Sequence, residues 1–132
     1  MTVTVVKLGG HALDATTNAG LLLDALATDL LEMQRDGDVA VLIHGGGPQI
    51  NKELELHNIK PEMINGRRKT TPEVLSVVSK VLSGEVLRGI VNQLIFLGVN
   101  AVGISSGDGG TIRAIYSEDA LGEVGVVDKV DP

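Results

Sequence analysis

The chain has 132 residues, of which 43% are hydrophobic and 2% aromatic, and a formal net charge of −6. This length suits one domain with a buried core, and the scarcity of aromatic residues requires that core to be aliphatic. The acidic balance argues against nonspecific nucleic-acid binding, which needs a basic surface. The chain has no cysteine, which excludes disulfides and thiolate metal sites. No apolar run approaches the roughly 20 residues of a membrane-spanning helix, and we expect a soluble cytoplasmic protein.

The first half of the chain alternates between predicted strands and helices. Thr2 to Leu8 is apolar and β-branched and stops at Gly9-Gly10, which indicates a buried strand followed by a tight turn. Ala19 to Gln34 has helical periodicity, Val39 to Ile43 predicts a second buried strand, and Pro48 suits the first turn of a helix that continues to about His57. This order is typical of a parallel sheet.

The first predicted helix has recognisable ends. Thr17 or Asn18 is suited to cap its start, and Gly37 is suited to end it in the left-handed conformation. The side chains expected on its apolar face are Leu22, Leu26, Leu30 and Met33.

The middle of the chain predicts a polar, basic loop from Pro61 to Thr71. Thr71-Pro72-Glu73 opens a helix, which Gly84 is expected to interrupt. A second apolar helix follows and ends at Gly98.

The last part of the chain predicts strands. Val99 to Ile104 indicates a third buried strand, and Asp108-Gly109 is a hairpin signal that predicts Thr111 to Tyr116 as the returning strand. The tail from Gly122 indicates a further short strand.

Two of the strands end in glycine-rich turns, Lys7-Leu8-Gly9-Gly10 and His44-Gly45-Gly46-Gly47. In a parallel sheet such turns share the carboxyl edge, where ligands bind, and glycine lets backbone N–H groups approach an anion closely. The helix beginning at Pro48 adds its positive dipole end, and Lys7 adds a full charge. The alternative is a pair of tight turns with Lys7 in solvent. Neither turn fits G-x-x-x-x-G-K-[ST] or G-x-G-x-x-G.

Two further motifs bear on function. Gly103-Ile104-Ser105-Ser106-Gly107 fits the nucleophile motif of esterases, but no histidine follows Ser105 and the next segment predicts a hairpin, so a hydrolase is disfavoured. The basic run Gly66-Arg67-Arg68-Lys69 suits capture of a carboxylate by an arginine fork. A solvated loop or an interface patch explains that run equally well.

Longer matches run through nearly the whole chain. They comprise Val5 to His11, Leu42 to Asn51, Asn65 to Pro72, Ala101 to Gly110 and Gly122 to Gly125. Together they resemble the amino acid kinase family, and within it the acetylglutamate kinases. The resemblance implies the amino-terminal lobe of a three-layer α/β/α sandwich with a mainly parallel central sheet. It also implies ATP-dependent phosphorylation of the γ-carboxylate of N-acetyl-L-glutamate in arginine biosynthesis.

Site roles follow from the same resemblance. Lys7 would stabilise the phosphoryl group in transfer, the amides of Gly9 and Gly10 would bind an ATP phosphate, and Arg68 would hold the α-carboxylate of the acceptor. The acceptor contacts implied at the second turn are those of Gly45, Gly46 and Gly47. The cofactor implied is ATP with Mg²⁺, and no residue of the chain is assigned as a metal ligand. Lys7, the triple-glycine turn and Arg68 are expected to surround one cleft.

The charges at Arg67 and Lys69 depart from the family pattern, which is apolar there. They leave open a kinase that acts on carrier-protein-bound aminoadipate or glutamate. Residues 1–132 are expected to form one acceptor-binding and dimerisation lobe without the nucleotide-binding carboxy-terminal lobe, and so to lack turnover alone. The chain could therefore also be a noncatalytic acceptor-binding or dimerisation module. The resemblance places the helix from about Glu85 to Leu97 at a homodimer interface, and burial within one domain is the alternative for that helix.

Overall fold

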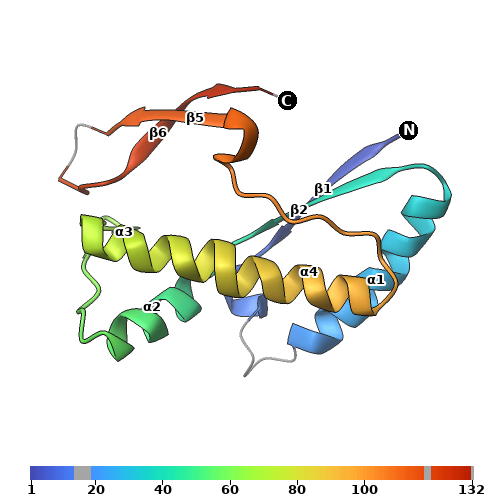
Figure 1. Ribbon diagram of the computed structural model, residues 1–132, viewed down its shortest axis with the longest axis horizontal. Helices are drawn as coiled ribbons and strands as arrows, with labels where there is room; N and C mark the ends of the chain where they lie inside the picture. Colours follow the sequence, from blue (N-terminus) through green and yellow to red (C-terminus); the bar gives the residue numbers. More distant parts are fainter. Residues whose placement is uncertain (14–18, 118–119, 132) are drawn as a thin grey trace.

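The computed structural model describes residues 1–13, 19–117 and 120–131 (Figure 1). The elements in chain order are β1 (Val3–Leu8), the 3-10 turn η1 (Gly10–Leu13), α1 (Ala19–Arg35), β2 (Val39–His44), α2 (Gly47–Leu56), β3 (Met63–Ile64), β4 (Arg67–Arg68), α3 (Pro72–Ser79), the π-helix η2 (Lys80–Val86), α4 (Leu87–Phe96), the 3-10 turn η3 (Asp108–Gly110), β5 (Ile112–Tyr116) and β6 (Gly125–Val130). Among these, no helix combines the length and the apolar character needed to cross a bilayer.

The predicted parallel pair is confirmed. β1 and β2 pair in register from Val3 opposite Val39 to Leu8 opposite His44. Parallel strands require a crossover connection, and α1 lies in the connection between these two. Both strands therefore end at the same edge of the sheet.

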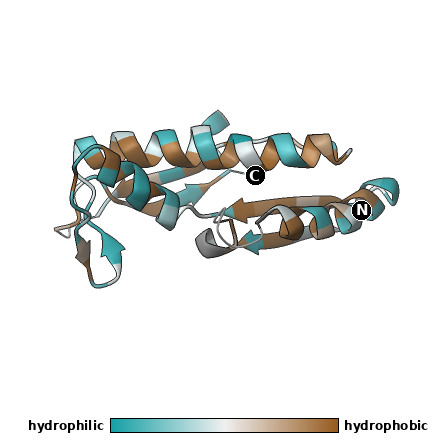
Figure 2. Cartoon of the chain, turned by 90° about the horizontal axis from the view of Figure 1, so that it is seen from below, coloured by the Kyte–Doolittle hydropathy of each residue, from teal (hydrophilic) through white to brown (hydrophobic). Residues whose placement is uncertain are grey.

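The three-layer arrangement is not seen in the described residues, because the two-stranded sheet is packed on one face. Leu8 is buried and Val6 joins the core beside it. Their neighbours on the opposite face are open, with Val5 61% and Ile43 52% exposed. Figure 2 shows that hydrophobic residues run along both strands. The fold is α/β with a parallel strand pair, helices on one face and an uncovered apolar face.

The core is aliphatic, as the composition predicts. It joins α1, α2, α3, η2, α4 and the end of β1 through buried aliphatic side chains. On α1 the buried positions are Leu23, Ala27 and Leu30, whereas Leu22 is 38% exposed. The predicted apolar face is therefore confirmed at Leu30, and at Leu26 and Met33, which pack against the core. It is wrong at Leu22, because Leu21, Leu22 and Leu23 are consecutive and only the packing selects Leu23 among them.

Helix ends follow the glycine signals. Gly37 and Gly98 have φ of 78° and 89°. This confirms the left-handed end predicted for α1 and the helix end predicted at Gly98. After α4 the Val99 N–H donates to the Leu94 carbonyl at 2.9 Å and the Gly98 N–H donates to the Ile95 carbonyl at 2.9 Å. This pair of bonds is the Schellman motif, which satisfies carbonyls at a helix end. The cap predicted at Thr17 or Asn18 lies outside the described residues.

The interruption predicted at Gly84 is wrong. α3, η2 and α4 run as one continuous rod (Figure 1), and the backbone stays right-handed helical at both junctions, Lys80 and Val86. Gly84 lies within the π-helical segment. The buried side chains Val81, Val86 and Ile90 pack on either side of it, so tertiary packing overrides the low helix propensity of glycine.

Thr71 caps the start of this rod, since its Oγ1 accepts a hydrogen bond from the Val74 N–H at 3.2 Å. We expect Thr71→Ala to lower the free energy of unfolding by about 1 kcal/mol, because an amide of the first turn loses its acceptor. Thr71→Ser keeps the hydroxyl and should stay close to the parent protein. Urea unfolding measures both, and equal losses in the two variants would contradict the capping role.

The predicted strand from Val99 to Ile104 is also wrong. Residues 100–105 form no strand, and the side chains of Val102 and Ile104 are 85% and 64% exposed. The segment lies beside α4, where Arg88 Nη2 donates to the Gly103 carbonyl at 3.1 Å. An apolar, β-branched run becomes a strand only where a partner strand pairs with it, and the described residues supply none.

The hairpin predicted at Asp108-Gly109 is replaced by η3. The strand β5 exists as predicted, but it pairs antiparallel with β6, from Tyr116 opposite Gly125 to Ile112 opposite Val130. The tail strand is thus confirmed as β6. Asp108 is used differently, since its Oδ2 accepts from the Ser105 N–H at 2.7 Å and fixes a local turn.

Candidate functional site

The carboxyl edge of the parallel pair brings the two glycine turns together. Lys7 lies opposite Ile43 at this edge, and its side chain is exposed. The Gly45 N–H donates to the Leu8 carbonyl at 3.2 Å, which extends the strand pairing into the second turn. The shared edge confirms the predicted proximity of Lys7 and the two turns, and it also commits the Gly45 amide to the sheet.

The first turn leaves its backbone open at Gly9. The Gly9 carbonyl accepts from the Ala12 N–H at 3.0 Å, which closes the 3-10 turn η1 that begins at Gly10. A Cβ added at Gly9 would meet nothing within 4 Å. Packing within the chain therefore does not explain the glycine at position 9. A glycine there lets a ligand approach the backbone closely.

The second turn opens α2. Gly46 occupies the N-cap position with no side-chain cap, its carbonyl accepts from the Ile50 N–H at 2.9 Å, and Pro48 lies in the first turn. The first amides of a helix have no partner within the helix, and Pro48 has no N–H. The amides of Gly46, Gly47 and Gln49 are therefore the donors that this helix start presents, with the positive end of the dipole behind them.

The glycines of this turn differ in their surroundings. A Cβ at Gly46 would lie 2.8 Å from Leu82 Cδ2 and 3.3 Å from Val86 Cγ2. Gly46 is therefore needed for the close packing of α2 against η2. Gly47 is exposed, and a Cβ there would meet nothing within 4 Å. Packing explains Gly46 and does not explain Gly47.

Arg68 lies on a short hairpin that the sequence analysis did not predict. The region interpreted as a loop contains β3 and β4, which pair antiparallel with Met63 opposite Arg68. The two residues between them, Asn65 and Gly66, have φ of 50° and 78°. Positive φ at both central residues is the I′ turn that Asn-Gly favours, so the signal was present in the sequence.

Arg68 is brought to the start of α2 by a contact that was not predicted. Its Nη2 donates to Asn51 Oδ1 at 2.7 Å. Asn51 follows Gly47 by four residues, so both lie on one face of the helix. The guanidinium is partly buried, and this burial lowers the pKa of Arg68. Arg68 therefore lies along the helix face that begins at the triple-glycine turn.

The neighbouring cation Lys69 is engaged elsewhere. Its Nζ lies 3.0 Å from Glu62 Oε2, and its N–H donates to the Glu62 carbonyl at 2.9 Å. Its charge is thus paired along the hairpin. This pairing weakens the argument that Lys69 selects a more anionic acceptor.

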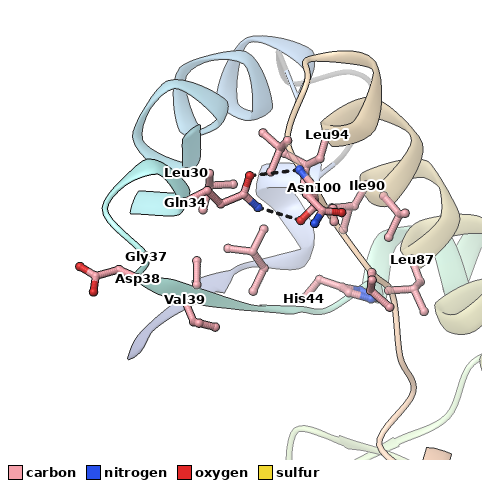
Figure 3. A pocket seen from close by; sticks show the side chains of 16 residues that line it. Leu30, Gln34, Gly37, Asp38, Val39, His44, Leu87, Ile90, Leu94 and Asn100 are labelled. Atoms are coloured by element: carbon pink, nitrogen blue, oxygen red, sulfur yellow. Dashed lines mark hydrogen bonds between the residues drawn. The ribbon is translucent and has the colours of Figure 1, made fainter. Parts of the chain in front are cut away.

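None of three cavities in the described residues is lined by the predicted site residues together. A cavity of about 500 Å³ lies between β2, α1, α4 and residues 99–102 (Figure 3), where Gln34 exchanges two hydrogen bonds with the backbone of Asn100. His44 is the member of the glycine turns that lines it. Lys7, Gly9, Gly47 and Arg68 line neither this cavity nor the two smaller ones near Asn51 and Gln49. In the described residues they are joined by the sheet edge and by α2.

The surroundings of Ser105 exclude the esterase alternative. Ser105 Oγ donates to Ser83 Oγ at 3.0 Å. The hydroxyl of a catalytic serine would instead donate to its histidine base. Residues 100–105 form no strand and η3 spans only Asp108–Gly110, so the strand-turn-helix of a nucleophile elbow is not formed.

The solved structures similar to this chain support the fold. The crystal structure of smu.665 from Streptococcus mutans UA159 aligns with a TM-score of 0.82 at 28% identity, over 98% of this chain and 51% of that one. An N-acetylglutamate synthase from Neisseria gonorrhoeae, solved with coenzyme A and N-acetyl-glutamate, aligns with a TM-score of 0.67 at 25% identity. That match covers 98% of this chain and 29% of the other.

Curated relatives are similar over most of the chain. The acetylglutamate kinase of Geobacillus thermodenitrificans is 44% identical over 83% of this chain, and that of Roseobacter denitrificans is 40% identical over 97%. The chain spans only 40% and 43% of the lengths of these two proteins. The sequence profile described as the amino acid kinase family matches residues 2–132. With that match over nearly every residue, the chain belongs to the amino acid kinase family.

Proposed function

We propose that the protein from which this chain comes is an acetylglutamate kinase, and that the chain carries its acceptor site and part of its phosphate site. The strongest support is the 40–44% identity to relatives that bear this name. The geometry agrees, since Arg68 lies along the helix face that begins with the exposed glycine Gly47. An anion at that helix start would meet free amides and a guanidinium together.

The chemistry proposed is direct transfer. A γ-carboxylate oxygen of N-acetyl-L-glutamate attacks the γ-phosphorus of ATP, the bond to the bridging oxygen breaks, and ADP leaves with that electron pair. Lys7 offsets the charge on the phosphoryl group in transfer, and the Gly9 and Gly10 amides hold an ATP phosphate. The amides at Gly46 and Gly47, with Gly45 beside them, orient the acceptor, and Arg68 holds its α-carboxylate. Phosphoryl transfer depends mainly on such positioning and charge stabilisation.

Mg²⁺ is proposed to arrive with ATP. The described residues contain no group of three histidine, aspartate or glutamate side chains that could hold a metal ion. Magnesium commonly binds through substrate phosphates and waters with one or two carboxylates. No step is therefore assigned to a metal site of this chain.

An acceptor comparison tests the proposal. ADP release, measured with ATP and N-acetylglutamate, glutamate or aminoadipate, should depend on N-acetylglutamate in the longest form of the protein. The 132-residue chain alone should bind the acceptor without turnover, since it spans less than half the length of the curated relatives. Activity only with carrier-protein-bound aminoadipate or glutamate would favour that alternative acceptor. ADP release by the short chain would overturn the expected lack of turnover.

Arg68→Ala should strongly weaken acceptor binding. Millimolar N-acetylglutamate is expected to raise the melting temperature of the parent chain, because a ligand at about 100 times its Kd adds about 2.7 kcal/mol to stability. In the variant the shift should fall to about half or less, since losing a charged hydrogen bond of about 1.5–3 kcal/mol raises the Kd about 10–150-fold. Arg67→Ala, which removes the adjacent exposed cation, is the matched control. A shift retained in full in Arg68→Ala would remove Arg68 from the acceptor site.

An exposed apolar end of α4 favours a dimerisation module as the second candidate. Ile95 and Phe96 are 54% and 83% exposed, whereas Ile90, Val91 and Leu94 are buried. The helix therefore offers one buried stripe and an open apolar end, rather than apolar positions all round. Exposed aromatic residues of this kind are common at interfaces.

Phe96→Ser should weaken self-association of the chain. Light scattering coupled to gel filtration should report a homodimer for the parent and a larger monomer fraction for the variant. Tyr116→Ser is the control, because Tyr116 is 74% exposed on the separate strand β5. A parent that stays monomeric at high concentration would count against the dimer.

Two further expectations, the three-layer arrangement and the cellular location, concern the whole protein. We propose that it adopts the three-layer α/β/α arrangement, because apolar side chains such as Val5 and Ile43 lie on the open face of the sheet. A cytoplasmic location is proposed with it, since the reaction consumes ATP.

A further inference from the structure

Asn51 is the side chain that connects the Arg68 hairpin to α2. Its Oδ1 accepts from Arg68 Nη2 at 2.7 Å, across 17 residues of sequence. The short distance is typical of a hydrogen bond with a charged partner. The main chain of Arg68 is held as well, since Thr70 Oγ1 donates to its carbonyl at 3.1 Å. Asn51 therefore fixes the far end of a side chain whose base is already fixed.

Only some of the N–H donors of the Arg68 guanidinium have a hydrogen-bond partner. Arg68 Nη1 is buried and has no hydrogen-bond partner among the described residues. A buried donor without an acceptor is unfavourable, so a free arginine would be expected to turn toward water. The hydrogen bond that Arg68 donates to Asn51 opposes that turn.

Within residues 1–13, 19–117 and 120–131 the Arg68 guanidinium forms no salt bridge with a carboxylate, and the side chain that holds it is an amide. The same hairpin carries Lys69, whose ammonium is matched by the carboxylate of Glu62 at 3.0 Å. Arg68 is instead held by a neutral acceptor. An asparagine can orient the guanidinium without neutralising it, and the charge remains available for an anionic ligand.

We propose that Asn51 is a positioning residue, which orients the Arg68 guanidinium toward the acceptor carboxylate while leaving its charge unpaired. The assignment of the carboxylate rests on the proposed function. The orientation of Arg68 does not, and it can be measured without any ligand.

The ligand-free measurement is nitrogen-15 relaxation of the Arg68 Nε–H group in the 132-residue chain. The group should be ordered in the parent and in Asn51→Asp, which keeps the accepting oxygen, and mobile in Asn51→Ala. Asn92→Ala, which removes an exposed asparagine from α4, should leave it ordered. An Arg68 signal that is equally ordered in Asn51→Ala would overturn the positioning role.

The kinetic measurement uses ADP release by the longest form of the protein. Asn51→Ala should raise the KM for N-acetylglutamate about 10–100-fold, by analogy with partners that orient metal ligands, with a much smaller change in kcat. Asn51→Asp should give an intermediate KM, because its charge competes with the acceptor for the guanidinium. A KM for Asn51→Asp at or below that of the parent would overturn the role of the unpaired charge.

A double-mutant cycle separates positioning from direct contact. Arg68→Lys removes the guanidinium that Asn51 orients. In that background Asn51→Ala should change KM far less than it does in the parent protein. An equal change in both backgrounds would mean that Asn51 contacts the acceptor itself, and the inference would be wrong. Failure of the proposed function has a different signature, since the parent would then release no ADP that depends on N-acetylglutamate.

Discussion

Leu54→Ala is expected to lower the free energy of unfolding by about 2–5 kcal/mol. Leu54 lies on α2 and is fully buried, at 0% exposure, within the aliphatic core. Its carbonyl also accepts from the Ile59 N–H at 2.8 Å at the end of the helix. Truncation removes apolar contacts and leaves a cavity that a close-packed core fills only partly. Urea unfolding followed by circular dichroism measures the loss.

Leu56→Ala is the matched control on the same helix. Leu56 is 69% exposed, and a surface substitution of this kind changes stability by about 0.5 kcal/mol or less. The contrast between two leucines two positions apart tests which face of α2 is buried. Equal losses would mean that α2 does not pack as described. Because the same helix begins at the triple-glycine turn, its seating on the core also sets the position of the candidate site.

Local signals in the sequence predicted most elements of the first half. Leu8 to Gly10 and Ile43 to Gly47 combine an apolar strand with glycine, and both became strand ends at one sheet edge. Gly37 and Gly98 ended helices because a left-handed residue completes the hydrogen bonds there. These features depend on neighbours within a few positions, and a sequence carries that information directly.

The errors have non-local causes. Val102 and Ile104 have the composition of a buried strand, yet strand formation requires a paired backbone that the described residues do not supply. Gly84 resembles a helix break, but the packing around Val81 and Val86 continues the rod through it. Neither outcome could be read from a window of adjacent residues.

The candidate site also contains residues that local motifs indicate and one residue that depends on a non-local contact. Lys7 and the glycine turns could be predicted as site candidates because they lie in strand-turn motifs. Asn51 was missed because its significance depends on Arg68, which reaches it through a hairpin 17 residues later. Asn65-Gly66 was a readable signal for that hairpin, and with it the sequence would have placed Arg68 on a short strand.

Lys7→Ala is expected to lower the kcat of the longest form of the protein about 10²–10³-fold, by analogy with the loss of one preorganised donor at a developing charge. Lys7 is the last residue but one of β1, beside the shared sheet edge, and its side chain is exposed. Under the proposed function its ammonium acts on the phosphoryl group in transfer, and the KM for the acceptor should change little. Initial rates of ADP release over a range of N-acetylglutamate concentrations measure both constants.

The stability of the same variant decides what Lys7 does. An exposed lysine contributes little packing, so Lys7→Ala should melt close to the parent, as should Lys129→Ala, which removes an exposed lysine from β6. Lys129→Ala should also keep full kcat. If Lys7→Ala loses stability in proportion to its activity, the lysine is structural. If stability is retained and kcat falls, the ammonium acts on the transition state, because uniform binding of the acceptor would have changed KM instead.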